Sequence, residues 1–169
     1  MWSLCSCLFP SRGKTPLRDE ASLRRFLSDP AITRETSKPY LPKIGLCKVV
    51  KVYDGDTITV AAPLFNGSFA PELEVYYFNV RIRGIDTPEI KTKNAAEKAL
   101  ALVARDALTE LVMGELVYLE NVATEKYGRL LCDVVMRSEE NLTINIGDWM
   151  LKNGYAVSYS GDTKTHIWK

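Results

Sequence analysis

The chain has 169 residues, of which 46% are hydrophobic and 25% are charged, and its formal net charge is +1. These values fit a soluble globular domain, and no apolar stretch approaches the ~20 residues of a membrane span. The four cysteines, Cys5, Cys7, Cys47 and Cys132, are neither spaced as metal ligands nor dense enough for a disulfide scaffold. We therefore expect an intracellular, cytoplasmic protein with reduced cysteines and no secretion signal.

The first 44 residues differ from the rest of the chain. They contain eight Lys and Arg against four acids, a net charge of +4, which leaves −3 for the remainder of a chain that carries +1 overall. Ser, Pro and mixed charges interrupt any long apolar period there. We predict an N-terminal arm at 1–44, partly disordered, and a folded domain at 45–169.

Two features of the arm predict local structure or attachment. Residues 19–28 carry apolar side chains at helical spacing, which predicts one short helix packed against the domain. Cys5 and Cys7 lie in a short apolar leader, where S-acylation would give a weak membrane tether. The alternative is that this leader is simply a disordered or packed end.

The segment 49–60 alternates apolar and polar residues around an Asp-Gly pair, which predicts a strand, a turn and a strand. Asp54 and Asp56 flank the glycine. Taken alone, they are explained as turn residues, because Asp and Gly are the commonest turn chemistry.

The segment 80–90 reads Val-Arg-Ile-Arg-Gly-Ile-Asp-Thr-Pro-Glu-Ile and joins a half-buried strand pattern to a tight turn. Pro88 fixes the backbone just after Asp86, so Asp86 and Glu89 are expected to project from one turn. Two carboxylates so placed are suited to a hard cation.

The remaining elements follow from their apolar patterns. We predict a helix at 94–113, strands at 116–120 and 130–136, and a second helix at 143–152. The residues expected to face the core from the first helix are Ala99, Leu100, Leu102, Val103, Ala107, Leu108, Leu111 and Val112. Those expected to do so from the second helix are Ile144, Ile146, Trp149, Met150 and Leu151.

A Lys-Tyr-Gly-Arg turn at 126–129 lies between the two later strands and adds a guanidinium whose planar fork suits a phosphate. Acids for a metal and arginines for an anion thus come from separate strands, as a site at one end of a barrel requires. His166 is the single histidine, which excludes mechanisms built on two histidines.

From about residue 48 to 159 the chain resembles the staphylococcal nuclease (thermonuclease, SNase-like) family. Asp-Gly-Asp-Thr at 54–57, Arg-x-x-x-x-Asp-Thr-Pro-Glu at 81–89 and Tyr-Gly-Arg at 127–129 occur in the family's order. The resemblance implies a mainly β fold with packed helices (α+β), built on a five-stranded Greek-key barrel of the OB type.

The resemblance also implies a calcium site. Asp56 and Asp86 would be the carboxylate ligands of Ca²⁺, and Thr87 would contribute its main-chain carbonyl. Asp54 would lie next to these ligands without contacting the ion itself. Calcium accepts six to eight oxygen ligands, which agrees with carboxylates and a carbonyl as donors.

The catalytic and substrate-binding residues are implied in the same way. Arg81 and Arg129 would bind the scissile phosphate, and Glu89 would hold or activate the attacking water. Lys126 and Tyr127 would lie near a terminal phosphate of the substrate.

Tyr155 and Tyr159 have two open interpretations, stacking on a substrate base or packing in the core. The implied activity is calcium-dependent cleavage of DNA, RNA or both, by an endonuclease or exonuclease that leaves 3′-phosphates and acts as a monomer. Two alternatives are a catalytically inactive OB-type module that binds nucleic acid or protein, and a structural barrel whose acids merely pair with its arginines.

Overall fold

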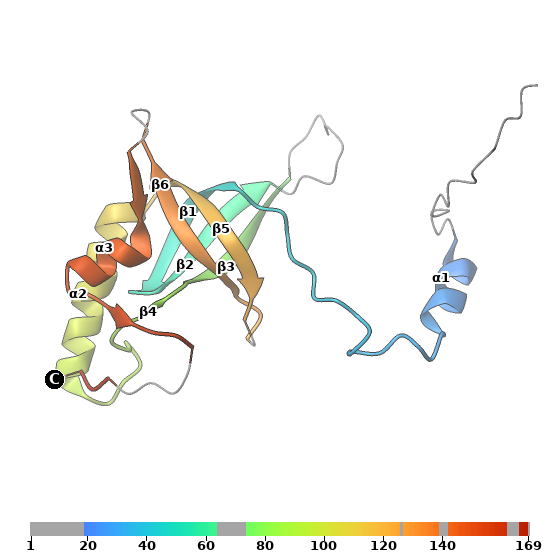
Figure 1. Ribbon diagram of the computed structural model, residues 1–169, viewed down its shortest axis with the longest axis horizontal. Coiled ribbons are helices and arrows are strands. Elements are labelled where there is room, and N and C mark those ends of the chain that lie inside the picture. Colours follow the sequence, from blue (N-terminus) through green and yellow to red (C-terminus); the bar gives the residue numbers. More distant parts are fainter. Residues whose placement is uncertain (1–18, 64–73, 126, 139–141, 162–165, 169) are drawn as a thin grey trace, which may run out of the picture. The chain divides into compact units, whose positions relative to one another are not determined.

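The computed structural model describes residues 19–63, 74–125, 127–138, 142–161 and 166–168 (Figure 1). Internal contacts divide the chain into Met1–Pro39 and Tyr40–Lys169. In the first unit, helix α1 (Glu20–Leu27) begins where the Asp19 side chain accepts the Ser22 N–H at 2.7 Å. The helix buries none of its residues, and its packing against the domain stays a prediction.

No helix within the described residues is long and apolar enough to cross a membrane. Cys5 and Cys7 lie outside those residues, so their acylation also stays a prediction. Cys47 and Cys132 are buried, unbridged cysteines of the domain.

Five strands of the second unit form a closed barrel. They are β1 (Leu46–Asp54), β2 (Thr57–Pro63), β3 (Val75–Ile82), β5 (Leu116–Thr124) and β6 (Leu130–Arg137). The order β3-β2-β1-β5-β6 is antiparallel throughout, and a parallel pairing of β3 with β6, centred on Arg81 opposite Leu131, closes the cylinder. The predicted five-stranded OB-type barrel with packed helices is confirmed.

Three short strands complete the domain. The strands β4 (Ile85–Asp86) and β8 (Val157–Ser158) form a separate two-stranded sheet, and β7 (Thr143–Asn145) extends the main sheet beside β6. Gly84, with φ of +79°, makes the turn from β3 into β4, a conformation that favours glycine. This turn brings Asp86 back beside the end of β3.

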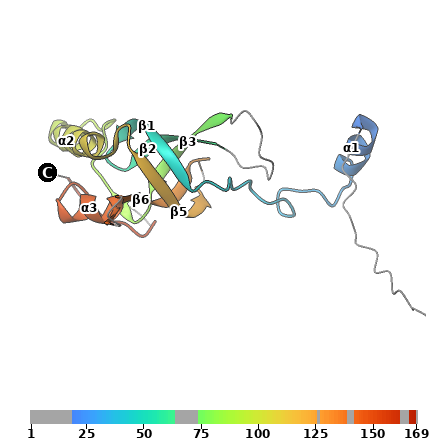
Figure 2. The same cartoon turned by 90° about the horizontal axis from the view of Figure 1, so that it is seen from above.

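Helices α2 (Ala95–Val112) and α3 (Ile146–Lys152) lie at the same end of the barrel in both views (Figures 1 and 2). Asn94 caps α2, because its side chain accepts the N–H groups of Ala96 and Glu97. Helix α2 contacts β1, whereas α3 contacts β6 and β7.

The barrel interior is filled by alternate residues of each strand, mostly Val and Ile, as period-two patterns require. The side chains that are at most 2% exposed and largest in volume are Ile58, Ile82, Ile85, Leu108, Ile146, Met150, Val49, Val60, Val80, Val112, Val117 and Val134. The helices therefore add to a core that the barrel strands supply.

The second predicted helix begins later than expected. Residues 143–145 are strand β7, in which Thr143 pairs with Arg137 and Ile144 pairs with Met136. Asn145 then caps α3 by accepting the Asp148 N–H at 3.1 Å. The expectation that Ile144 faces the core is wrong, since this β-branched residue is 40% exposed on an edge strand.

The buried face of α2 also differs from the prediction. Ala99, Leu100 and Val103 were expected to face the core and are exposed, whereas Ala101 and Ala104 are buried together with Leu108 and Val112. These three exposed residues show that apolar residues alone did not identify the contact face. The small side chain of Ala104 allows close packing of the helix against Gly55 in the β1–β2 turn.

Candidate active site

The Asp-Gly-Asp turn connects β1 to β2 and lies against α2. The Asp54 carboxylate accepts the Asp56 N–H at 3.3 Å, as in a local Asp turn. A Cβ at Gly55 would lie 2.9 Å from Thr87 Cγ2 and 3.0 Å from Ala104 Cβ, so only glycine fits. The close packing holds Asp56, which is buried, beside the segment that carries Asp86.

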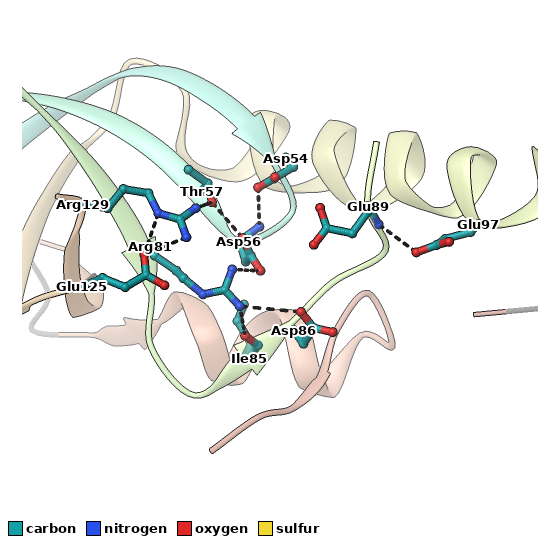
Figure 3. Close-up of polar contacts among 10 residues, drawn as sticks. All are labelled: Asp54, Asp56, Thr57, Arg81, Ile85, Asp86, Glu89, Glu97, Glu125 and Arg129. Carbon is teal, nitrogen blue, oxygen red and sulfur yellow. Dashed lines mark hydrogen bonds and ion pairs between the residues drawn. The ribbon is translucent and has the colours of Figure 1, made fainter. Parts of the chain in front are cut away.

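Arg81, at the end of β3, is the buried cation of the site and is only 8% exposed. Its guanidinium donates to the carboxylate of Asp56 and, at 3.2 Å, to the carbonyl of Ile85. The Asp86 carboxylate lies 3.6 Å from the same guanidinium (Figure 3). The turn at Gly84 thus lets Arg81 contact one acid of the β1–β2 turn and one acid of β4.

The pKa of Asp56 is raised from 3.8 to about 7, chiefly because burial disfavours the charged carboxylate. The negative charge of Asp54 also acts to raise this pKa, whereas Arg81 and a hydrogen bond from Thr57 act to lower it. The Asp56 carboxyl is therefore costly to ionise in spite of its arginine partner. Strongly shifted carboxyl groups of this kind are frequent at functional sites.

Asp86 and Thr87 are buried, and Glu89 is exposed at the edge of the same site. Figure 3 shows the Glu89 carboxylate directed toward the side on which Asp54, Asp56 and Asp86 lie. The Glu89 N–H donates to Glu97 in the first turn of α2 at 3.3 Å. This contact anchors the backbone of Glu89 to a helix.

Arg129 reaches the site from the turn between β5 and β6. Its Nε and one terminal nitrogen each lie 2.7 Å from the Glu125 carboxylate. Its other terminal nitrogen lies 3.4 Å from the Thr57 hydroxyl, which in turn donates to Asp56 at 2.8 Å. A chain of polar contacts therefore joins Arg129 through Thr57 to Asp56 (Figure 3).

The four predicted substrate-binding residues are placed differently from one another. Lys126 lies outside the described residues, and Tyr127 is 73% exposed. Tyr155 stacks on Trp149 at a centroid separation of 5.8 Å and packs against the core. Tyr159 donates its N–H to the Gly84 carbonyl and lies with its ring 5.8 Å from the Arg81 guanidinium. Of the two tyrosines with open interpretations, only Tyr159 is beside the arginine.

A cavity of about 580 Å³ adjoins Arg81 and is lined also by Arg83, Glu125 and Tyr159. Three polar residues of this region, Thr57, Glu125 and Arg83, carry no predicted role from the sequence. Glu125 precedes Arg129 by four residues, but across a turn rather than along a helix, so spacing alone did not indicate their contact. Arg83 donates to the Leu131 carbonyl at 3.0 Å, which ties β3 to β6.

The acids of the site offer only oxygen atoms, the donors that a hard cation such as Ca²⁺ prefers. Within the described part of the chain, no three Asp, Glu, His or Cys side chains are grouped closely enough to hold a metal ion as they stand. Asp56 is paired with Arg81 in this arrangement. The donor chemistry thus fits calcium, and Asp56 already accepts hydrogen bonds from Thr57 and Arg81 through its two carboxylate oxygens.

An OB-type barrel with acids and arginines gathered at one end defines the class of protein. Residues 79–167 match the family model described as staphylococcal nuclease homologue. The chain therefore belongs to the staphylococcal nuclease family. The matched range contains Arg81, Asp86, Glu89 and Arg129, whereas the Asp-Gly-Asp turn precedes it.

Two curated relatives are similar to this chain. An uncharacterized protein of Methanocaldococcus jannaschii is 30% identical over 132 residues, which cover 66% of this chain and 58% of that protein. A protein of Coccidioides posadasii named probable endonuclease LCL3 is 28% identical over 92 residues, which cover 54% of this chain and 30% of that protein. The chain thus spans between about a third and three fifths of the length of these relatives.

Proposed function

We propose that the chain is a calcium-dependent nuclease that hydrolyses phosphodiester bonds of DNA, RNA or both. The observation that carries this proposal is the meeting of Arg81, from β3, and Arg129, from the β5–β6 turn, with Asp56 and Glu89 at one end of the barrel. A phosphodiester is an anion with a poor leaving group, so its hydrolysis needs positive charge at the phosphate and a group that activates water.

The two arginines would bind the scissile phosphate. Guanidinium groups match phosphate oxygens through paired N–H donors. Arg81 is buried and Arg129 is partly buried, so their charge is less screened than it would be at an open surface. A preorganised donor of this kind contributes about 3 to 4 kcal/mol to stabilisation of the transition state in other enzymes.

Glu89 would act on the attacking water. Its carboxylate is exposed at the edge of the site, where it can accept a proton from water. The water oxygen then bonds to phosphorus, the bond from phosphorus to the 5′ oxygen breaks, and that oxygen takes a proton from solvent. The products are a 3′-phosphate and a 5′-hydroxyl.

The carboxylates of Asp56 and Asp86 and the main-chain carbonyl of Thr87 would hold Ca²⁺, with Asp54 behind them. A bound calcium ion would supply positive charge and Lewis acidity at the phosphate. Asp56 must be ionised to be a ligand, so its raised pKa means that cation binding competes with protons near neutral pH. Lys126 and Tyr127 would contact a terminal phosphate of the substrate.

A binding module without catalysis is the second candidate. The observation that favours it is the Asp56–Arg81 ion pair, because a proposed metal ligand and a proposed phosphate ligand here satisfy each other. The two candidates differ in whether substrate is cut when calcium is supplied.

The test incubates the purified chain with single-stranded DNA, duplex DNA and RNA in calcium, in magnesium and in chelator. Glu89→Gln and Arg129→Ala are compared with Glu110→Gln and Arg137→Ala, an exposed acid on α2 and an arginine paired with Glu120. We expect calcium-dependent cutting that only the first two substitutions abolish. A folded wild type that binds these substrates but cuts none of them with either metal would favour the binding module.

A further inference from the structure

Tyr53 and Lys91 form an aromatic and basic pair at the edge of the site. Tyr53 directly precedes Asp54 at the end of β1, and Lys91 follows Glu89 by two residues. The Tyr53 side chain is 42% exposed, and the Lys91 ammonium lies 5.7 Å from the centre of its ring. Neither residue has a part in the proposed chemistry.

Packing in the core does not explain the position of the Tyr53 side chain. Strand alternation turns Val52 and Asp54 inward, where Val52 packs against the core and Asp54 is buried, and leaves Tyr53 on the outer face. An aromatic ring in that position offers a face on which a base can stack, and an ammonium group offers a contact for phosphate. Contact with the Tyr53 hydroxyl raises the pKa of Lys91 above its usual value, and a lysine is charged at neutral pH even without this contact.

The residues that adjoin this pair in sequence, Asp54 and Glu89, lie on the side of the site away from Glu125, which lines the cavity. Figure 3 shows Asp54 and Glu89 on one side of the Asp56–Arg81 pair and Glu125 and Arg129 on the other. Tyr53 and Lys91 adjoin the first two residues in sequence, whereas the cavity is lined by Glu125 and Tyr159. A polynucleotide bound across the two arginines would therefore meet the cavity on one side and, on the other, the Asp54 and Glu89 segments that carry this pair.

We propose that Tyr53 and Lys91 form a subsite for a nucleotide that flanks the scissile phosphate of a single-stranded polynucleotide. The base stacks on Tyr53, and its phosphate contacts Lys91. This subsite rests on the proposed nuclease function and adds to it a preference for internal bonds, because nucleotides are held on both sides of the bond that is cut. Duplex substrate is disfavoured, since a paired base cannot stack on the ring.

The test compares a 12-nucleotide single-stranded DNA with a p-nitrophenyl phosphodiester of one nucleoside. We expect Tyr53→Leu and Lys91→Gln each to raise KM for the 12-mer about five-fold or more, while cleavage of the single-nucleoside substrate is unchanged. Tyr53→Phe keeps the ring and is expected to match the wild type. Lys91→Gln is also expected to lower the slope of log affinity against log salt by about one.

Matched controls are Tyr77→Leu and Lys98→Gln, which alter an exposed tyrosine on β3 and an exposed lysine on α2. The subsite would be overturned if the Tyr53→Leu and Lys91→Gln variants lost activity equally on both substrates, or if the control variants lost as much activity on the 12-mer. If the wild type cuts neither substrate, the nuclease proposal fails independently of the subsite proposal. Binding of the 12-mer, measured by fluorescence anisotropy, then tests the subsite. Weaker binding by only the Tyr53 and Lys91 variants would support it, and unchanged binding would overturn it.

Discussion

The guanidinium of Arg81 and the carboxylate of Asp56 form a buried ion pair where the ends of β2 and β3 meet. The pair joins a proposed phosphate ligand to a proposed cation ligand. Both groups are nearly removed from water, so each depends on the other for compensation of its charge. The site is therefore also a part of the domain's stability.

Arg81→Met should lower the free energy of unfolding by about 3 to 5 kcal/mol, because Asp56 is left buried without its partner. Urea unfolding at pH 7 in chelator measures the change. Arg137→Met is the control, since its ion pair with Glu120 is roughly half exposed and should contribute less than about 1 kcal/mol. Equal losses in the two variants would contradict the importance of burial.

Stability should depend on pH through Asp56. Its pKa is raised to about 7 in the folded chain from 3.8, so between these values the folded chain keeps a proton that the unfolded chain releases. The contribution of this group is therefore full below about pH 4, falls as the pH rises toward 7, and is constant above. Asp56→Asn removes the titration.

The measurement is the unfolding free energy of the wild type minus that of Asp56→Asn, from pH 4 to pH 8 in chelator. We expect this difference to decrease up to about pH 7 and then to level off. A difference that increases with pH would show that Arg81 outweighs burial and lowers the pKa of Asp56.

Gly55→Ala should destabilise the domain by about 1 to 3 kcal/mol, because the added Cβ would overlap with Thr87 and Ala104. It should also reduce nuclease activity, since the displaced turn carries Asp56. Gly45→Ala is the control, because a Cβ there meets nothing within 4 Å. Thermal unfolding of the two variants, followed by circular dichroism, provides the comparison.

The strands and turns that carry the motifs could be predicted from the sequence because they depend on local patterns, whereas the five-stranded barrel was implied by the resemblance to the staphylococcal nuclease family. Strand alternation and turn chemistry located β1, β2, β3 and β6, and fixed spacing within 81–89 tied Arg81 to the turn that carries Asp86. These patterns need no knowledge of long-range packing.

Prediction from the sequence was wrong or incomplete where tertiary contacts determine the local structure. A helix pattern at 143–152 includes Thr143 and Ile144, and pairing with β6 makes these two residues a strand. The buried face of α2 follows from its approach to Gly55, a contact between segments about fifty residues apart that no periodicity reveals. The Glu125–Arg129 ion pair depends likewise on the shape of a turn.

Glu125 occupies one edge of the Arg129 guanidinium. Nε and one terminal nitrogen both lie 2.7 Å from a single Glu125 oxygen, so a phosphate that binds this edge must displace the carboxylate. Glu125→Gln removes the competing charge and should tighten binding of a nucleoside 3′,5′-bisphosphate. A partly exposed pair contributes about 1 kcal/mol, which corresponds to about a five-fold lower Kd.

Calorimetric titration in calcium measures this Kd, with Glu120→Gln as the control at the Arg137 pair. Glu120 is paired with an arginine outside the site, so its substitution should leave the Kd unchanged. A Kd that rises in Glu125→Gln would mean that the carboxylate positions Arg129 rather than competing for it. Tighter binding in Glu125→Gln alone would show that the unliganded site holds Arg129 with an internal substitute for the substrate phosphate.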